Sequence, residues 1–153
     1  MFEYTLLPDG LVISNICFSL ASATYLILSL TPFDVINIGN IVAISESSGV
    51  EIIKTCSGLG SIGLYSCFVI SYPGSNKRRI LFLISGILAI ILLNIVRLCL
   101  LVITEAFWTI HWDNIHSVSP YIFFYPLILG LWYYWTKIND HQNIFSIQEH
   151  SVV

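Results

Sequence analysis

The chain has 153 residues, of which 56% are hydrophobic and only 10% are charged, and its mean hydropathy is +0.84. Soluble domains carry about 25% charged residues, so this composition excludes an ordinary cytosolic domain and a disordered protein. The net charge of −3 and the pI near 5.7 argue against a basic surface that binds DNA or RNA. What remains is a small integral membrane protein.

Four stretches are nearly free of charged side chains, and each approaches the roughly 20 residues that cross a bilayer core. They predict transmembrane helices at about 11–31, 57–73, 79–104 and 118–136. We expect the first helix to be retained rather than cleaved as a signal peptide. The residues before it include Glu3 and Asp9 but no Lys or Arg.

The basic residues predict the orientation of these helices. Lys77, Arg78 and Arg79 lie between the second and third spans, and Lys137 follows the fourth. By the positive-inside rule these ends face the cytoplasm. The protein is therefore predicted to be a multi-pass protein of the inner (cytoplasmic) membrane with both termini cytoplasmic.

Residues 33–55 differ from the helical runs. The apolar segments 35–38 and 41–44 flank Gly39 and Asn40, which is typical of a two-residue β-hairpin. The predicted fold is mainly α: about four transmembrane helices with a small β-hairpin element on the outer face. Residues 1–138 are expected to form a single membrane domain, and 139–153 a polar cytoplasmic tail.

Polar residues of three different helices are expected to meet near the outer end. Arg97 is the only charge between Ile80 and Thr104, and an intramembrane charge indicates function by default. Asn94 lies on the same helical face, three residues earlier. Cys56 is expected at the start of the second span and His116 at the start of the fourth.

These residue types suit nucleophilic acyl transfer. The positive end of a helix dipole favours a thiolate at Cys56, and Gly58, which follows Ser57, allows close approach of another backbone or a substrate. A thiolate attacks a carbonyl carbon, His116 moves protons, and Arg97 stabilises an oxyanion. No cofactor is implied.

Other interpretations of the same residues stay open. Arg97 could pair structurally with an acid, and the available acids are Glu51, Glu105 and Asp113. Cys17, Cys67 and Cys99 lie within apolar runs and are predicted to be inert. His111 and His116 lack the i,i+4 spacing of a helical zinc pair, so no metal site is predicted.

Three motifs together resemble the blocks of the exosortase/archaeosortase family. They are Cys56-Ser57-Gly58-Leu59, Asn94-Ile95-Val96-Arg97 and His116-Ser117-Val118, and the resemblance covers residues 33–136. It implies a membrane-embedded cysteine protease/transpeptidase, a hydrolase-type enzyme of protein sorting. Such enzymes cleave a C-terminal sorting signal at the outer face. The signal consists of a short motif, a transmembrane helix and a basic tail. The new C-terminus passes through a Cys thioester to a lipid or surface anchor.

The resemblance also implies residue roles. Cys56 is the nucleophile, Arg97 the transition-state stabiliser and His116 the acid/base residue, with His111 as the alternative. Typical members have more spans, and they often carry glycine where this chain has Ser119 and Pro120. Two alternatives remain: a non-enzymatic small membrane scaffold or subunit, and a purely hydrolytic intramembrane cysteine protease.

Overall fold

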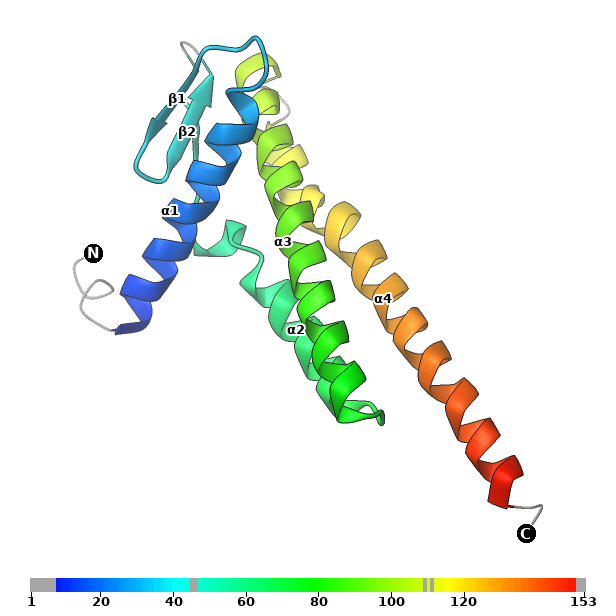
Figure 1. Cartoon of the computed structure of the whole chain (residues 1–153). Helices are drawn as coiled ribbons and strands as arrows, with labels where there is room; N and C mark the ends of the chain where they lie inside the picture. Colours follow the sequence, from blue (N-terminus) through cyan, green and yellow to red (C-terminus); the bar gives the residue numbers. More distant parts are fainter. Residues whose placement is uncertain (1–7, 45–46, 109, 111, 151–153) are drawn as a thin grey trace.

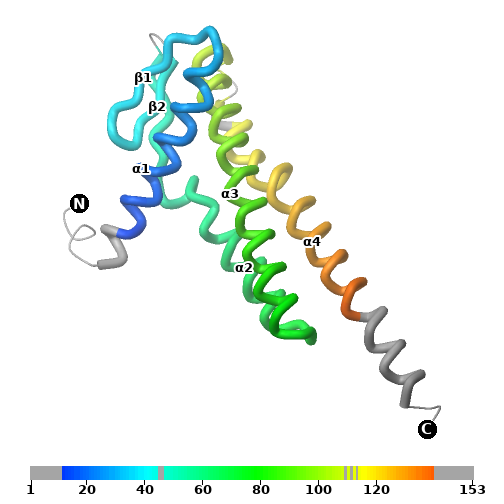
Figure 2. Tube along the Cα trace, viewed as in Figure 1, coloured from blue at the N-terminus to red at the C-terminus, as the bar shows by residue number. Residues whose placement is uncertain are grey.

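The computed structural model describes residues 8–44, 47–108, 110 and 112–150 (Figures 1 and 2). Within these residues the chain forms four α-helices, one 3-10 helix and three short strands. Their order is α1 (Pro8–Leu28), β1 (Val35–Ile38), β2 (Ile41–Ile44), β3 (Val50–Glu51), the 3-10 helix η1 (Lys54–Cys56), α2 (Leu59–Ser71), α3 (Asn76–Phe107) and α4 (Trp112–His150). The fold is therefore mainly helical with a small sheet, as predicted.

The strands form one antiparallel sheet in the order β1-β2-β3. Ile38 pairs with Ile41, so Gly39 and Asn40 form the predicted two-residue turn, and Gly39 has φ +68°. The third strand was not predicted. It follows Gly49, which has φ +77° and whose added Cβ would lie 2.9 Å from the Cβ of Ala43. Glycine therefore lets the chain turn back tightly against β2.

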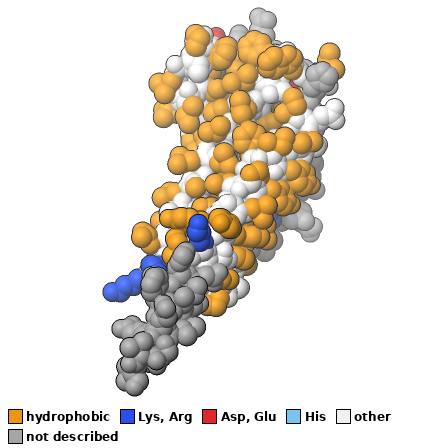
Figure 3. Space-filling view, turned by 90° about the vertical axis from the view of Figure 1, so that its right-hand side faces the viewer, with side chains coloured by type: hydrophobic (Ala, Val, Ile, Leu, Met, Phe, Trp, Pro, Cys, Tyr) orange, Lys and Arg blue, Asp and Glu red, His pale blue; other side chains and the backbone are white. Residues whose placement is uncertain are grey.

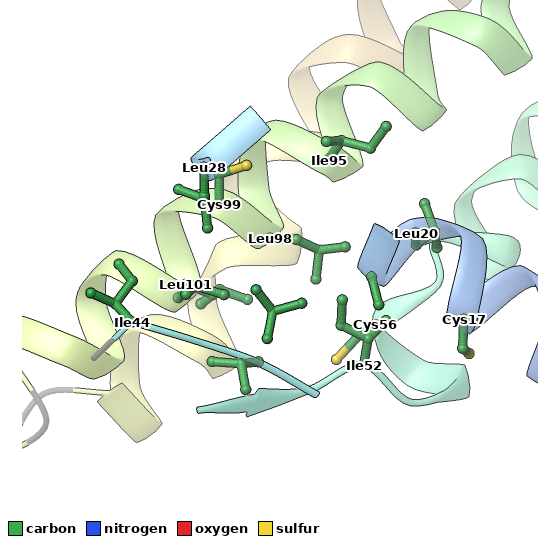
Figure 4. Close-up of a cluster of buried hydrophobic side chains, with 14 residues drawn as sticks. Cys17, Leu20, Leu28, Ile44, Ile52, Cys56, Ile95, Leu98, Cys99 and Leu101 are labelled. Atoms are coloured by element: carbon green, nitrogen blue, oxygen red, sulfur yellow. The ribbon is translucent and has the colours of Figure 1, made fainter. Parts of the chain in front are cut away.

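The sheet packs against α1 and α3 through buried apolar side chains (Figure 4). Val42, Val50 and Ile52 are almost fully buried in the same cluster as Leu28 of α1 and Leu101 of α3. Full burial of one such aliphatic side chain contributes about 1.5–3 kcal/mol relative to its exposure to water. This cluster anchors the segment β3–η1, which leads directly to Cys56.

A second apolar cluster holds α2, the first half of α3 and α4 together. Its buried members are Tyr65, Val69, Ile90, Phe124, Ile128 and Trp135. Tyr65 packs over Gly86, where an added Cβ would lie 2.1 Å from the tyrosine oxygen. The Tyr65 hydroxyl donates a hydrogen bond to the Phe82 carbonyl at 2.7 Å. Helix α3 is thus the central element of the fold, since it packs against every other helix.

The outer surfaces of the helices are strongly apolar. Figure 3 shows one face covered by hydrophobic side chains, with Lys and Arg side chains at its lower end. By length and composition two helical segments can cross a membrane, Asn76–Phe107 and Asn114–Asn139. Val12–Leu28 and Leu59–Ser71 are shorter apolar helices. The four-span topology and the outward position of the hairpin remain predictions.

Helix ends differ from the predicted spans for local reasons. Helix α2 begins at Leu59 rather than 57 because Gly58 before it is left-handed, with φ +74°. Helix α4 begins at Trp112 and continues to His150, whereas the predicted span was 118–136. A charge-free run marks the length of apolar surface, and a helix can continue into polar residues on either side.

Candidate active site

Cys56 is the last residue of η1 and lies before helix α2 rather than in it. Its amide N–H donates to the Ile53 carbonyl at 2.9 Å, which closes the short turn. The side chain is only 2% exposed. This placement differs from the predicted position at the start of a helix, because α2 begins three residues later. The prediction that the α2 helix dipole favours a thiolate at Cys56 assumed that Cys56 lies in the first helical turn, and it therefore does not apply in that form.

Asn94 of α3 holds the backbone of this turn. Its Nδ2 donates to the carbonyl oxygen of Cys56 at 3.0 Å, and the bond is buried. Gly58 lies against the same side chain, since an added Cβ would be 3.4 Å from Asn94 Cγ. The polar face predicted for α3 thus supports the cysteine-bearing loop directly.

His116 reaches the thiol from the beginning of α4. Its Nε2 lies 3.5 Å from the Sγ of Cys56, within hydrogen-bonding range for sulfur. The indole of Trp112, one helical turn earlier, stacks on the imidazole with ring centroids 4.8 Å apart and an angle of 14°. Stacking restricts rotation of the ring and so favours the orientation that faces Cys56.

Arg97 completes the cluster from α3. It is only 2% exposed, and its guanidinium is close enough to Cys56 to interact with it electrostatically. Its Nε–H donates to Ser119 Oγ at 2.8 Å, and its Cζ lies 5.8 Å from the ring centre of Phe124. Among the residues that the structure describes, Nη1 is buried without a hydrogen-bond partner. A buried cationic donor in this state is poised to bind an anionic oxygen.

The cluster lies within the helix bundle rather than at its rim. Asn94 is thirteen positions before Phe107, where α3 ends, which corresponds to about 20 Å along the helix axis. Cys56 lies beside this part of α3 because its carbonyl oxygen accepts the bond from Asn94.

The remaining predicted residues have different positions. Ser57 is buried, and both its hydroxyl and its N–H donate to the Lys54 carbonyl, at 2.6 and 3.2 Å. The Ser57 N–H is therefore used in a hydrogen bond within the turn. His111 lies outside the described residues. No cluster of three or more His, Cys, Asp or Glu side chains suited to a metal occurs in the described part of the chain.

Sequence reasoning missed two contributors to the cluster, Ser119 and Trp112. Ser119 had been noted only as a departure from the family pattern, and Trp112 carried no motif signal. On α4, Trp112 lies four residues before His116 and Ser119 lies three residues after it, so the three residues share one helical face. That periodicity could have indicated both residues once the start of the helix was known.

An apolar cavity of about 500 Å³ lies beside the cluster. Residues of α1, α2 and α3 form its walls, including Leu20, Leu59 and Ile95, and Ser57 lies at its margin. The cavity therefore adjoins the residue that follows Cys56.

Comparison with known proteins gives one family. The model of the family described as "Transmembrane exosortase" matches residues 2–133. Searches of curated proteins and of solved structures gave no match. The matched range includes Cys56, Asn94, Arg97, His116 and Ser119.

Proposed function

The chain belongs to the transmembrane exosortase family, and from this premise we propose that it is a membrane-embedded cysteine transpeptidase that processes C-terminal sorting signals. The family is one of membrane proteins that act on sorting signals in general. The observation that carries the finer proposal is the contact of 3.5 Å between Cys56 Sγ and His116 Nε2, with the buried Arg97 guanidinium close to the same thiol. A nucleophile, a base and a cation from three separate segments meet at one point.

The first half-reaction forms a thioester. His116 Nε2 accepts the thiol proton of Cys56, and the thiolate attacks the scissile carbonyl carbon of the sorting signal. The buried Nη1 of Arg97, which has no hydrogen-bond partner in the described residues, supplies a donor for the oxyanion that develops. The tetrahedral intermediate collapses, the C–N bond breaks, and the protonated His116 gives its proton to the leaving amine.

The second half-reaction releases the product. His116 removes a proton from the nucleophilic group of the acceptor, which attacks the thioester carbonyl. Collapse breaks the C–S bond, and the released thiolate regains a proton from His116. If water replaces the acceptor, the product is a free carboxylate, which is the purely hydrolytic alternative.

The substrate's apolar helix enters the cavity between α1, α2 and α3 in this proposal. Two observations support that route. Most of the side chains that line the cavity are apolar, which suits a helix taken from lipid, and Ser57 connects the cavity to the proposed nucleophile. A helix docked there places the segment that precedes it next to Cys56. The membrane face on which this occurs is predicted to be the outer one.

The test is processing of a reporter protein that carries a sorting motif, an apolar helix and a basic tail, in the host membrane. Cys56→Ala, His116→Ala and Arg97→Gln should each abolish processing while folded protein persists in the membrane. Cys67→Ala is the matched control, because Cys67 is exposed on α2. Processing at the wild-type rate by Cys56→Ala would refute the proposal.

Mass spectrometry of the product then separates transfer from hydrolysis. A mass adduct on the new C-terminus indicates transfer to an acceptor. A free C-terminal carboxylate indicates a hydrolytic protease. Absence of any Cys56-dependent product, in protein shown to be folded, favours the non-enzymatic scaffold.

A further inference from the structure

The two hydrogen-bond partners of the Ser119 hydroxyl determine where its proton points. Its Oγ donates to the His116 carbonyl oxygen at 3.0 Å and lies 2.8 Å from Arg97 Nε. A carbonyl oxygen can only accept, and a guanidinium nitrogen can only donate. The single hydroxyl proton therefore points to the carbonyl, and the oxygen lone pair faces Arg97.

The proline that follows explains why the His116 carbonyl needs this donor. In an α-helix the carbonyl of residue 116 accepts the N–H of residue 120. Residue 120 is Pro120, inside α4, and proline has no N–H. The hydroxyl of Ser119 supplies the missing bond. Proline thus turns a helical carbonyl into an acceptor that fixes the serine rotamer.

The fixed serine in turn orients the arginine. Arg97 is buried, and bonding at Nε leaves the two terminal nitrogens for Cys56 and for a substrate oxygen. The ring of Phe124 lies 5.8 Å from the guanidinium and borders it on another side. Without Ser119 the guanidinium would lose its hydrogen bond at Nε and could rotate about its last side-chain bonds.

We propose that Ser119 and Pro120 form a positioning unit that aims the Arg97 guanidinium at Cys56. The unit acts through Arg97 and touches neither the thiol nor the substrate. It takes the place that glycine often has in the family. The inference rests on the proposed function for its importance to turnover, but its geometry is tested without a substrate.

The experiment measures the rate at which iodoacetamide alkylates Cys56 in detergent-solubilised protein with Cys17, Cys67 and Cys99 replaced by Ala. A nearby, well-aimed cation stabilises the thiolate that reacts. Ser119→Ala should lower the rate about tenfold, the size expected for losing one hydrogen bond to a charged group. Ser119→Thr, which keeps the hydroxyl, should restore most of it. Ser117→Ala is the control, since Ser117 is exposed two residues away.

A second comparison shows whether Ser119 acts through Arg97. In an Arg97→Gln background, Ser119→Ala should have no further effect on the alkylation rate. An undiminished effect there, or an unchanged rate for Ser119→Ala alone, would overturn the proposal. If Ser119→Ala fails to fold, Pro120→Ala is used instead. It restores the N–H for His116, frees the serine proton, and should lower the rate with the same dependence on Arg97.

The two proposals fail separately. Normal coupling in the alkylation assay, together with no processing by the wild-type protein, would leave the positioning unit standing and remove the transpeptidase function. Normal processing that is insensitive to Ser119→Ala would leave the transpeptidase function standing and remove the positioning unit.

Discussion

Asn94 on α3 donates a hydrogen bond from Nδ2 to the carbonyl oxygen of Cys56, with 3.0 Å between nitrogen and oxygen. The bond joins a side chain of the central helix to the backbone of the proposed nucleophile. It explains how a cysteine in a short 3-10 turn, rather than in a helix, is held at a defined position. Arg97 lies one turn further along the same helix, so a single element sets the separation of the two groups.

Replacing Asn94 should damage both stability and processing. Asn94→Leu removes the donor and leaves the buried Cys56 carbonyl unsatisfied, which costs about 1–3 kcal/mol. We expect a lower unfolding temperature in detergent and a loss of processing that exceeds the loss of folded protein. Asn76→Leu, at the exposed start of α3, is the control. Processing by Asn94→Leu equal to that of the control would show that the bond does not position Cys56.

Gly58 is predicted to be required for its backbone conformation. Its φ of +74° lies in the left-handed region, whereas the contact of an added Cβ with Asn94, at 3.4 Å, is ordinary. Gly58→Ala should therefore cost about 1–2 kcal/mol through backbone strain alone. Gly63→Ala, inside α2 with open space around it, should be neutral or slightly stabilising. Equal stabilities of the two variants would contradict this reasoning.

Sequence alone located the helices better than it located their ends. Four apolar runs predicted four helices, because backbone groups in lipid must be satisfied within a helix. The hairpin followed from Gly39 and Asn40. The strand β3 has only two residues, too few for a pattern. The start of α2 depended on the left-handed Gly58, and that conformation is visible only in three dimensions.

For the site, too, the sequence predicted which residues lie near one another but not their local geometry. Helix direction was enough to expect Cys56, Arg97 and His116 near one another, and the structure brings them together. Their chemical roles remain a proposal. The local setting of Cys56 was wrong, because Cys56 was assigned to the start of a helix, whereas it ends the 3-10 helix η1 before α2 begins. The bonds of Ser119 depend on the loss of a helical hydrogen bond at Pro120, which follows from the i to i+4 spacing only once His116 is known to lie inside the helix.

The reactivity of Cys56 is predicted to depend on His116. Because the thiol is 2% exposed, a small uncharged reagent such as iodoacetamide is required rather than a bulky charged maleimide. In protein whose only cysteine is Cys56, His116→Ala should slow alkylation several-fold. In protein whose only cysteine is Cys67, which is exposed on α2, the same change should have no effect. Equal slowing at both cysteines would indicate a general loss of structure instead of a specific pair.

The cavity between α1, α2 and α3 should govern substrate binding rather than the chemistry at Cys56. Ala23 of α1 lines it, so Ala23→Trp should fill part of the space and raise the substrate concentration needed for half-maximal processing. Leu26→Trp, at an exposed position on the same helix, is the control. Alkylation of Cys56 by iodoacetamide should be unchanged in both. A processing rate unaffected by Ala23→Trp would place the substrate helix elsewhere.

The orientation predicted from Lys77, Arg78 and Arg79 can be tested at two exposed serines. Ser48 lies between β2 and β3, and Ser75 lies between α2 and α3. Each is replaced by Cys in protein whose native cysteines are all Ala, and intact cells receive a membrane-impermeant maleimide. Ser48→Cys should be labelled and Ser75→Cys should not, because the basic turn stays in the cytoplasm. The opposite pattern would place the sheet on the cytoplasmic side. The sheet from which β3 and η1 lead to Cys56 would then face the cytoplasm, and the proposed processing at the outer face would be refuted.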